Sequence, residues 1–437
     1  MPVPMSGTFR RRPVPLAVTA LGAALSLTVL TGCGGGGGGG SADASGKVEG
    51  SITFQTWNLR AEYKDFFNDL IDRFEKKHPD AKVRWIDKPA EGYAETLSAD
   101  AASEKLPDVV NVSPDLAYPL AKAGVLMNLS EDETAAKAEK KYMPEAWKGN
   151  EMPGLDGVFA YPWYLNTGPM FYNKRLFKEA GLNPEKPPEN YAQLFSDGEK
   201  LAKKKVPALA ATPTIEDFGR YGVPLMNKEG TKFTYNSPKG VEFMEKYKRL
   251  YDKGGLDSQV MSSSPEKAGQ KFEQEKVAMN PGGALDLKNF KDNQPDLYKN
   301  IGITEAPNNN GHPNMSVMSL GVAQQSEHKA AAVAFAQFVT DQRNQEAFAR
   351  KVAVFPSTKG SLDKPYWTKE GSSPEDRVRV SSAKLVKDAV NYTPAVMTDP
   401  MKTVLQKEVS KVFLGKKSPK KALDDAVAES DKLLKQL

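Results

Sequence analysis

Aromatic and amide side chains crowd one short stretch of the chain, residues 161–182, which reads YPWYLNTGPMFYNKRLFKEAGL. Its aromatic residues are Tyr161, Trp163, Tyr164, Phe171 and Tyr172, and its amides are Asn166 and Asn173. An aromatic ring presents a flat apolar face, and an amide both donates and accepts hydrogen bonds. Together these side chains suit the binding of a small hydroxylated ligand, so the stretch is the first candidate for a binding site.

Motifs of catalysis do not occur in the sequence. There is no G-x-S-x-G, H-E-x-x-H or P-loop motif, and G-x-G-x-x-G occurs only inside the glycine run 34–40. The three histidines do not form a triad or metal-ligand pattern, and the single cysteine excludes the usual thiolate zinc site. We therefore expect no catalysis, metal or cofactor. A hydrolase with a carboxylate pair stays open as an alternative, because the chain has 55 acidic residues.

The first 32 residues predict an export signal. Residues 10–12 are three arginines, residues 16–30 form an apolar run that is short for a membrane span, and the sequence LTG precedes Cys33. This arrangement resembles the bacterial lipoprotein signal, in which the thiol of the cysteine is lipidated. We therefore expect removal of the signal and a lipid anchor on Cys33. A buried Cys33 behind an ordinary secretory signal is the alternative, and the Sec and twin-arginine export routes both remain open.

Residues 33–48 predict a flexible tether, since Cys33 is followed by seven glycines and the segment can bury almost no apolar area. Removing residues 1–32 takes away three arginines and no acid, which leaves 57 basic and 55 acidic residues. The remaining chain is close to neutral and has no basic stripe with interleaved aromatic residues. We therefore expect no nucleic-acid partner.

Six elements of alternating type are predicted between residues 51 and 123. Apolar residues alternate or run together at 51–57, 82–86 and 108–112, which predicts strands, and they follow helical spacing at 63–78, 93–105 and 116–123. The order βαβαβα is typical of a parallel, doubly wound sheet. Ligands bind such sheets beyond the carboxyl ends of the strands. Those ends are Trp57-Asn58, Asp87-Lys88 and residues 113–115.

A second set of elements follows the aromatic stretch. Strands are predicted at 158–161, 208–212, 301–306 and 315–323, and helices at 191–204, 237–253 and 330–340. Residues 173–182 predict a further helix that ends at Gly181, so the first half of the aromatic stretch is the better site candidate. We predict an α/β chain with two lobes.

Several longer runs carry a resemblance to a known family. They are ITFQTW at 52–57, residues 67–79, residues 106–129, the aromatic stretch, residues 272–283 and MSLGVAQQSEHKAAAVAFAQFV at 318–339. In this order the chain resembles the family 1 extracellular solute-binding proteins of bacterial ABC importers, in the carbohydrate-binding group that includes maltose-binding protein. The likeness extends from about residue 50 to the end.

The resemblance implies a periplasmic-binding-protein-like fold with an interlobe cleft and discontinuous lobes. The first lobe would hold residues 49–164 and 316–354, and the second 165–315 and 355–437, with crossings near 163–167, 314–319 and 354–358. Such a protein closes on a sugar and delivers it to the transmembrane subunits of a permease. We therefore expect a monomer, without enzyme activity, that is lipid-anchored on the extracellular face of the bacterial cell membrane.

The resemblance also assigns roles at the strand ends. Trp57 and Asn58 lie in a loop that contacts sugar in the family, with a core tryptophan as the alternative for Trp57. Asp115 lies where relatives place a carboxylate that accepts hydrogen bonds from sugar hydroxyls, and its alternative is a helix N-cap. Trp163, Tyr164 and Asn166 fall at the first crossing, where rings would cover a pyranose and the amide would bind its hydroxyls; their alternative is hinge packing.

Three further residues are weaker candidates. Gly282 and Gly283 would let the backbone approach a ligand, with a plain turn as the alternative, and Ser316 lies at the second crossing. Many relatives carry a tryptophan near Leu285, and its absence here makes a large aromatic floor doubtful unless another aromatic replaces it. A mono- or disaccharide is as plausible as a longer sugar. A peptide, polyol or polyamine is the alternative solute; a polyamine pocket would need several converging carboxylates.

Overall fold

The computed structural model describes residues 44–262, 264–371 and 373–437. The predicted signal peptide, Cys33 and the glycine run lie outside the described residues. Within these described ranges, no helix has both the length and the apolar composition needed to cross a membrane. Two β-sheets organise the unit Ala42–Leu437 and position the candidate site.

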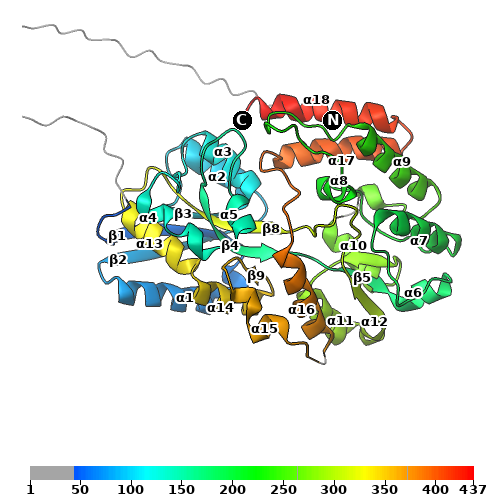
Figure 1. Cartoon of the computed structure of the whole chain (residues 1–437), viewed down its shortest axis with the longest axis horizontal. Coiled ribbons are helices and arrows are strands. Elements are labelled where there is room, and N and C mark those ends of the chain that lie inside the picture. Colours follow the sequence, from blue (N-terminus) through cyan, green and yellow to red (C-terminus); the bar gives the residue numbers. More distant parts are fainter. Residues whose placement is uncertain (1–43, 263, 372) are drawn as a thin grey trace, which may run out of the picture. The chain divides into compact units, whose positions relative to one another are not determined.

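The larger sheet has six strands in the order β2-β1-β3-β8-β4-β9 (Figure 1). Strand β1 runs parallel to both β2 and β3, and β8 runs antiparallel to β3 and β4. The parallel βαβαβα unit predicted from the sequence is therefore confirmed. The strands are β1 (Gly50–Trp57), β2 (Ala81–Lys88), β3 (Val109–Val112), β4 (Ala160–Asn166), β8 (Ser316–Val322) and β9 (Phe355–Pro356).

Helices cover both faces of this sheet, because its strands bury side chains on both sides. Phe54 of β1 packs in one core with α1, α13 and α14, whereas Val110 and Val112 of β3 pack in another core with α2 and α3. The helices are α1 (Arg60–Lys77), α2 (Tyr93–Ala102), α3 (Pro114–Lys122), α13 (Lys329–Val339) and α14 (Gln342–Val352), with the short α4 (Glu133–Ala136) and α5 (Pro144–Lys148).

The smaller sheet has three antiparallel strands in the order β6-β5-β7. They are β5 (Met170–Asn173), β6 (Met279–Pro281) and β7 (Ile301–Thr304). Helices α17 and α18 pack against each other and against α9. The helices between β5 and β7 are α6 (Lys174–Glu179), α7 (Tyr191–Lys203), α8 (Ile215–Tyr221), α9 (Pro238–Asp252), α10 (Pro265–Glu273), α11 (Ala284–Asn293) and α12 (Pro295–Asn300). The helices after β9 are α15 (Pro365–Thr368), α16 (Pro374–Lys387), α17 (Asp399–Phe413) and α18 (Pro419–Leu434).

The strand predicted at 208–212 is wrong. Its backbone makes one isolated parallel bridge, between Leu209 and Leu256, and the N–H of Met279 donates to the carbonyl of Ala208 at 2.9 Å. Pro207 and Pro213 flank the segment and lack the N–H that a longer ladder would need. The apolar run is buried, but it is too short between its prolines to form a regular strand.

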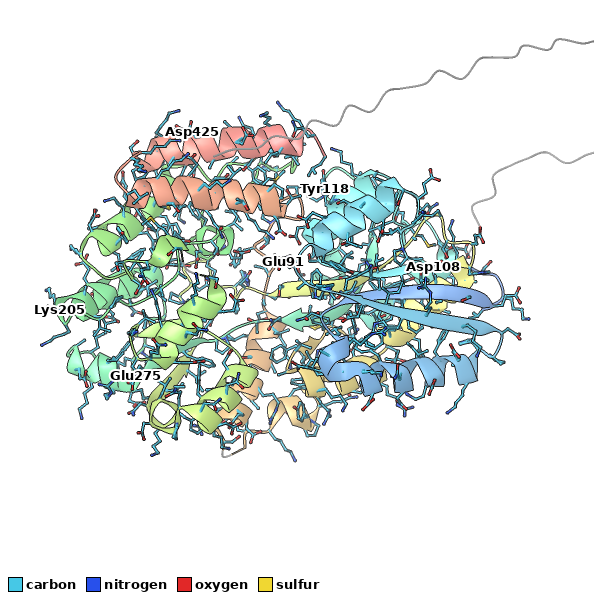
Figure 2. All side chains as sticks on the ribbon, turned by 180° about the vertical axis from the view of Figure 1, so that it is seen from behind. Glu91, Asp108, Tyr118, Lys205, Glu275 and Asp425 are labelled. Atoms are coloured by element: carbon cyan, nitrogen blue, oxygen red, sulfur yellow. The ribbon has the colours of Figure 1, made fainter. Side chains whose placement is uncertain are left out.

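Asp108 and Glu91 mark opposite ends of the larger sheet (Figure 2). At the amino end, the carboxylate of Asp108 accepts hydrogen bonds from the N–H of Thr53 at 2.7 Å and from the hydroxyl of Ser326 at 2.6 Å. This carboxylate ties β1, β3 and the segment after β8 together. Glu91 lies beyond the other end, where β2 has finished and α2 is about to begin. The candidate site lies at this carboxyl end.

Candidate ligand-binding cleft

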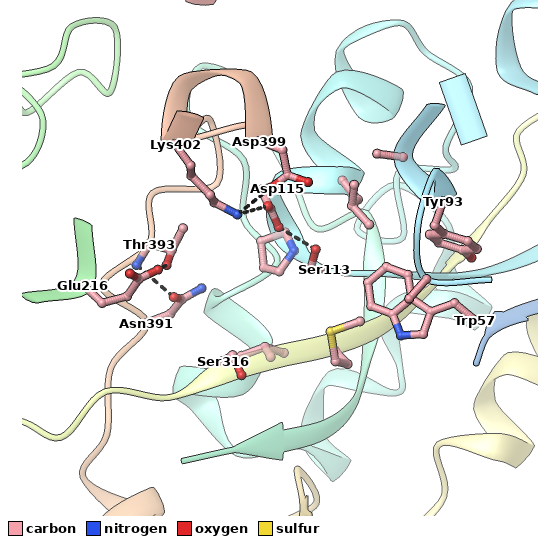
Figure 3. A pocket seen from close by; sticks show the side chains of 16 residues that line it. Trp57, Tyr93, Ser113, Asp115, Glu216, Ser316, Asn391, Thr393, Asp399 and Lys402 are labelled. Carbon is pink, nitrogen blue, oxygen red and sulfur yellow. Dashed lines mark hydrogen bonds and ion pairs between the residues drawn. The ribbon is translucent and has the colours of Figure 1, made fainter. Parts of the chain in front are cut away.

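A cleft of about 380 Å³ lies between the carboxyl end of the larger sheet and a facing wall formed by α8, α17 and the segment before α17 (Figure 3). One wall comes from the ends of β1 and β3, the starts of α2 and α3, and the first residues of β8. It consists of Trp57, Ala90, Tyr93, Ala94, Ser113, Pro114, Asp115, Leu116, Ser316, Val317 and Met318. The facing wall, from α8, α17 and the segment between α16 and α17, consists of Glu216, Asn391, Thr393, Asp399 and Lys402.

Two aromatic side chains form the apolar part of the first wall. Trp57 is the last residue of β1, and Tyr93 is the first residue of α2. Their rings meet edge to face, with centroids 4.6 Å apart and planes at 78°. The Tyr93 hydroxyl donates to the carbonyl of Asn111 at 2.8 Å, which fixes the ring that supports Trp57. Trp57 is partly buried against this core and presents the rest of its surface to the cleft.

Asp115 connects the two walls. Its carboxylate accepts a hydrogen bond from the Ser113 hydroxyl and pairs with the Lys402 ammonium at 2.6 Å, with α17 as the source of the lysine. Lys402 also reaches the carboxylate of Asp399, at 3.1 Å. Burial alone would lower the pKa of Lys402, but Asp115 and Asp399 outweigh it and raise this pKa above its usual value. Lys402 is therefore charged at neutral pH.

The facing wall also carries hydrogen-bonding groups that are held in place. The Thr393 hydroxyl donates to the Glu216 carboxylate, and the Thr393 N–H donates to the side-chain oxygen of Asn391 at 3.0 Å. Both residues belong to the extended segment between α16 and α17, which Glu216 of α8 holds from the side. Carboxylate and amide groups that are fixed in this way can accept hydrogen bonds from ligand hydroxyls without reordering first.

Trp57, Asp115 and Ser316, three of the predicted site residues, lie together in this cleft. The N-cap alternative for Asp115 is wrong: Ser113 occupies the N-cap position of α3, and Asp115 lies in its first turn. Asn58 follows Trp57 with a φ of 50° and is exposed, but it lies outside the cleft lining. Asn166 is exposed at the end of β4, where it pairs in register with Ser316.

The structure places Trp163 in the core, so its side chain has no free face for a ligand. Trp163 is 1% exposed and stacks on Phe348 of α14, with ring centroids 4.9 Å apart and planes at 19°. Its other neighbours include Phe54 and Phe67. Tyr164 packs against the same core, and burial raises the pKa of its phenol. Strand β4 lies between β8 and β9 in the sheet, and α5, α13 and α14 pack against it.

Gly282 and Gly283 also lie outside the cleft lining, and packing explains why Gly282 is a glycine. A Cβ atom at Gly282 would come within 2.3 Å of the Phe171 ring. The Gly282 N–H donates to the carbonyl of Pro169 at 3.0 Å, and the Gly283 N–H donates to the Asp286 carboxylate at 2.7 Å. Gly282 thus follows the last residue of β6, and Gly283 is the N-cap residue of α11. A close approach of this pair to a ligand stays a prediction.

Tyr93 escaped prediction, and so did every residue of the facing wall: Glu216, Asn391, Thr393, Asp399 and Lys402. Tyr93 could have been found, because it opens the helix that follows the second predicted strand. Lys402 could not, since 287 residues separate it from its partner Asp115. Asn391 lies in an extended segment without any motif in the sequence. Among the described residues, no group of three or more His, Cys, Asp or Glu side chains has the arrangement of a metal site.

Comparison with known proteins places this geometry in context. Residues 60–346 match the sequence pattern of the bacterial extracellular solute-binding protein family. The sn-glycerol-3-phosphate-binding periplasmic protein of Pectobacterium atrosepticum is 24% identical over 426 residues, which cover 87% of this chain and 90% of that protein. The multiple sugar-binding protein of Streptococcus mutans is 24% identical over 327 residues, covering 70% and 75%.

Solved structures share the fold. A putative oligosaccharide periplasmic-binding protein from Synechococcus sp. superposes with a TM-score of 0.78 at 24% identity, covering 88% of this chain and 99% of that one. The GacH receptor of Streptomyces glaucescens, whose structures include a complex with acarbose, superposes with a TM-score of 0.69 at 21% identity, covering 89% and 99%. The predicted fold class is confirmed.

Proposed function

The chain belongs to the family of bacterial extracellular solute-binding proteins, and we propose that it captures a sugar in the cleft beside Trp57 and delivers it to the permease of an ABC importer. The observation that carries this proposal is the composition of the cleft. An aromatic wall of Trp57 and Tyr93 faces carboxylate and amide acceptors on α8 and on the segment before α17. The aromatic face suits the C–H side of a sugar ring, and the acceptors suit its hydroxyls.

The volume of the cleft limits the size of the sugar. About 380 Å³ falls at the lower end of the range of small-molecule sites, roughly 300–1,000 Å³. This favours a mono- or disaccharide over a long oligosaccharide. The position of the cleft is also consistent with the rule that α/β sheets bind ligands beyond the carboxyl ends of their parallel strands.

Capture would proceed by closure of two lobes, with residues 49–164 and 316–354 in one and 165–315 and 355–437 in the other. Both walls of the cleft contact a ligand only when they are close, so the ligand shifts the population toward the closed form. Two of the proposed crossings are held together, since the Thr167 hydroxyl donates to the carbonyl of Asn314 at 2.7 Å. Closure would then be a rotation about a connected hinge.

The same proposal places the protein outside the cell as a monomer, without enzyme activity, anchored through Cys33 after removal of residues 1–32. The residues LTG before Cys33 and the glycine run behind it support this assignment. Cys33→Ser should move the protein from the membrane fraction of the source cells to the soluble fraction. Retention of the variant in the membrane fraction would contradict the anchor and leave the sugar proposal intact.

Thermal unfolding with a panel of sugars, polyols, peptides and polyamines tests the ligand class. A sugar at 100 times its Kd should add about 2.7 kcal/mol to the free energy of unfolding. Trp57→Ala should remove this gain, because the variant lacks the aromatic wall. Stabilisation by a peptide or polyamine with no effect of any sugar or polyol would reject the sugar proposal, and turnover of a glycoside would reject the binding-only role.

A further inference from the structure

The charges in the cleft are unevenly divided. Among the described residues that line it, Asp115, Glu216 and Asp399 are acidic, and Lys402 is the single cation. Lys402 is already shared between two carboxylates, at 2.6 Å from Asp115 and 3.1 Å from Asp399. The lining therefore has a surplus of negative charge, and two of the three N–H donors of its ammonium already face carboxylates of the protein.

The N-termini of the helices that begin at the cleft also have carboxylates of the protein beside them. The N-terminus of a helix attracts anions, because its N–H groups and its dipole point outward. Asp115 lies in the first turn of α3, and Asp399 is the first residue of α17. Each of these two helix ends thus meets a carboxylate of the protein itself. Helix α2 also begins at the cleft, and Glu95 is the acidic residue of its first turn. The features that could hold a phosphate, three helix ends and one ammonium, therefore each have a carboxylate of the protein beside them.

We infer that the cleft selects by charge: it accepts a hydroxylated ligand that is neutral or carries an amine, and it rejects phosphate esters. This inference rests on the proposed function and narrows its ligand class. It also separates this chain from the Pectobacterium relative, which is named for sn-glycerol 3-phosphate. A phosphate monoester carries nearly two negative charges at neutral pH. In this cleft those charges would face Glu216 and compete with Asp115 and Asp399 for one lysine.

Calorimetric titration of the purified chain tests the inference with matched pairs of ligands. The probes are glucose, glucosamine, glucose 6-phosphate, glycerol and sn-glycerol 3-phosphate, together with any sugar found in the thermal panel and its phosphorylated form. The phosphorylated member of each pair should bind at least about 100-fold more weakly than the unphosphorylated one, since like charges juxtaposed in a binding site oppose association strongly. Raising the salt concentration should narrow this ratio, because screening weakens charge repulsion and leaves steric exclusion unchanged.

The Asp399→Asn variant tests whether charge repulsion or steric exclusion causes the rejection of phosphate esters. The variant frees Lys402 from one carboxylate, so it should raise the affinity for the phosphorylated probes at least about tenfold. Asp363→Asn is the matched control, because Asp363 pairs with Lys387 on the surface and lies outside the cleft; it should change nothing. Tighter binding of a phosphate ester than of its parent sugar would overturn the inference, as would an Asp399→Asn variant that still rejects phosphate. Absence of binding by every probe and sugar would instead reject the proposed function itself.

Discussion

Two tryptophans of the same sheet, Trp57 and Trp163, have opposite surroundings. Trp57 is the last residue of β1, and Trp163 lies inside β4. Both are next to other aromatic side chains, and both belong to segments that resemble the same family. In the structure Trp57 lines the cleft, whereas Trp163 is 1% exposed and stacked on Phe348. The difference follows from position along the strand, because a side chain at the carboxyl end has the cleft beyond it.

Density of aromatic residues is therefore a poor guide to a binding surface in this fold. Strand β4 is buried over its first four residues, and its rings fill the core between the sheet and α14. An end residue such as Trp57 instead has support on one side, from Tyr93, and open space on the other. Four experiments can break or sharpen this contrast.

The largest expected effect is on stability, from Trp163→Ala. Removing a fully buried tryptophan leaves a cavity among Phe54, Phe67 and Phe348, which should lower the free energy of unfolding by about 3–5 kcal/mol. Urea denaturation of the variant and the original chain measures this loss. A loss below about 1 kcal/mol would show that Trp163 is not packed as the structure has it, and would restore it as a candidate for the ligand.

Trp57→Ala should instead lower the affinity for ligand more than it lowers the stability of the fold. It removes an edge-to-face contact with Tyr93, so the free energy of unfolding should fall by only about 1 kcal/mol. Affinity for the sugar found by thermal screening should fall at least about tenfold, which corresponds to about 1.4 kcal/mol. Calorimetry measures the affinity, and Trp163→Phe serves as the control that keeps a ring in the core. Unchanged affinity of the Trp57 variant would remove the aromatic wall from the proposed site.

The sequence alone predicts the parts of the structure that depend on local patterns. Alternation and helical spacing predict the βαβαβα unit correctly, because each pattern lies within one element. The burial of Trp163 depends on Phe348, and the lack of space for a side chain at Gly282 depends on Phe171; neither contact follows from residue spacing. For the same reason, residue spacing does not identify Lys402 as a cleft residue, because its partner Asp115 is 287 positions away in the sequence. Strand ends, in contrast, are visible in the sequence, which is why Trp57 and Asp115 could be proposed, whereas Ser316 was proposed from the crossing that the family resemblance implies. The binding roles of all three residues stay predictions.

The ion pair between Asp115 and Lys402 across the cleft should have a smaller effect on stability. Lys402→Met leaves the Asp115 carboxylate, which is 13% exposed, without its cation, and Asp115→Asn removes the carboxylate instead. The loss in free energy of unfolding on combining the two changes should be smaller than the sum of the single losses, with a coupling of about 1 kcal/mol, because the pair is only partly buried. A double-mutant cycle by urea denaturation measures the coupling. Additive losses would show that the pair does not join the two walls.

The smallest effect concerns Tyr172, another aromatic residue from the stretch that contains Trp163. Its side chain is buried, its hydroxyl donates to the carbonyl of Pro184 at 2.8 Å, and burial together with the charge of Glu185 raises its pKa to about 12. Tyr172→Phe should lower the free energy of unfolding by about 1 kcal/mol at pH 8 through the lost hydrogen bond.

The loss of stability in Tyr172→Phe should depend on pH, because the pKa of Tyr172 is raised in the folded chain. A phenol whose pKa is higher in the folded chain than in the unfolded chain, where it is about 10, stabilises the fold fully below pH 10. This contribution declines as the pH rises from 10 through 12, because the unfolded chain ionises first. The difference between the original chain and Tyr172→Phe should therefore shrink over that window, as measured by urea denaturation at pH 8, 10 and 11. A difference that stays constant would mean that Tyr172 is solvated, and that the stretch from Tyr161 to Tyr172 is more open than the core position of Trp163 requires.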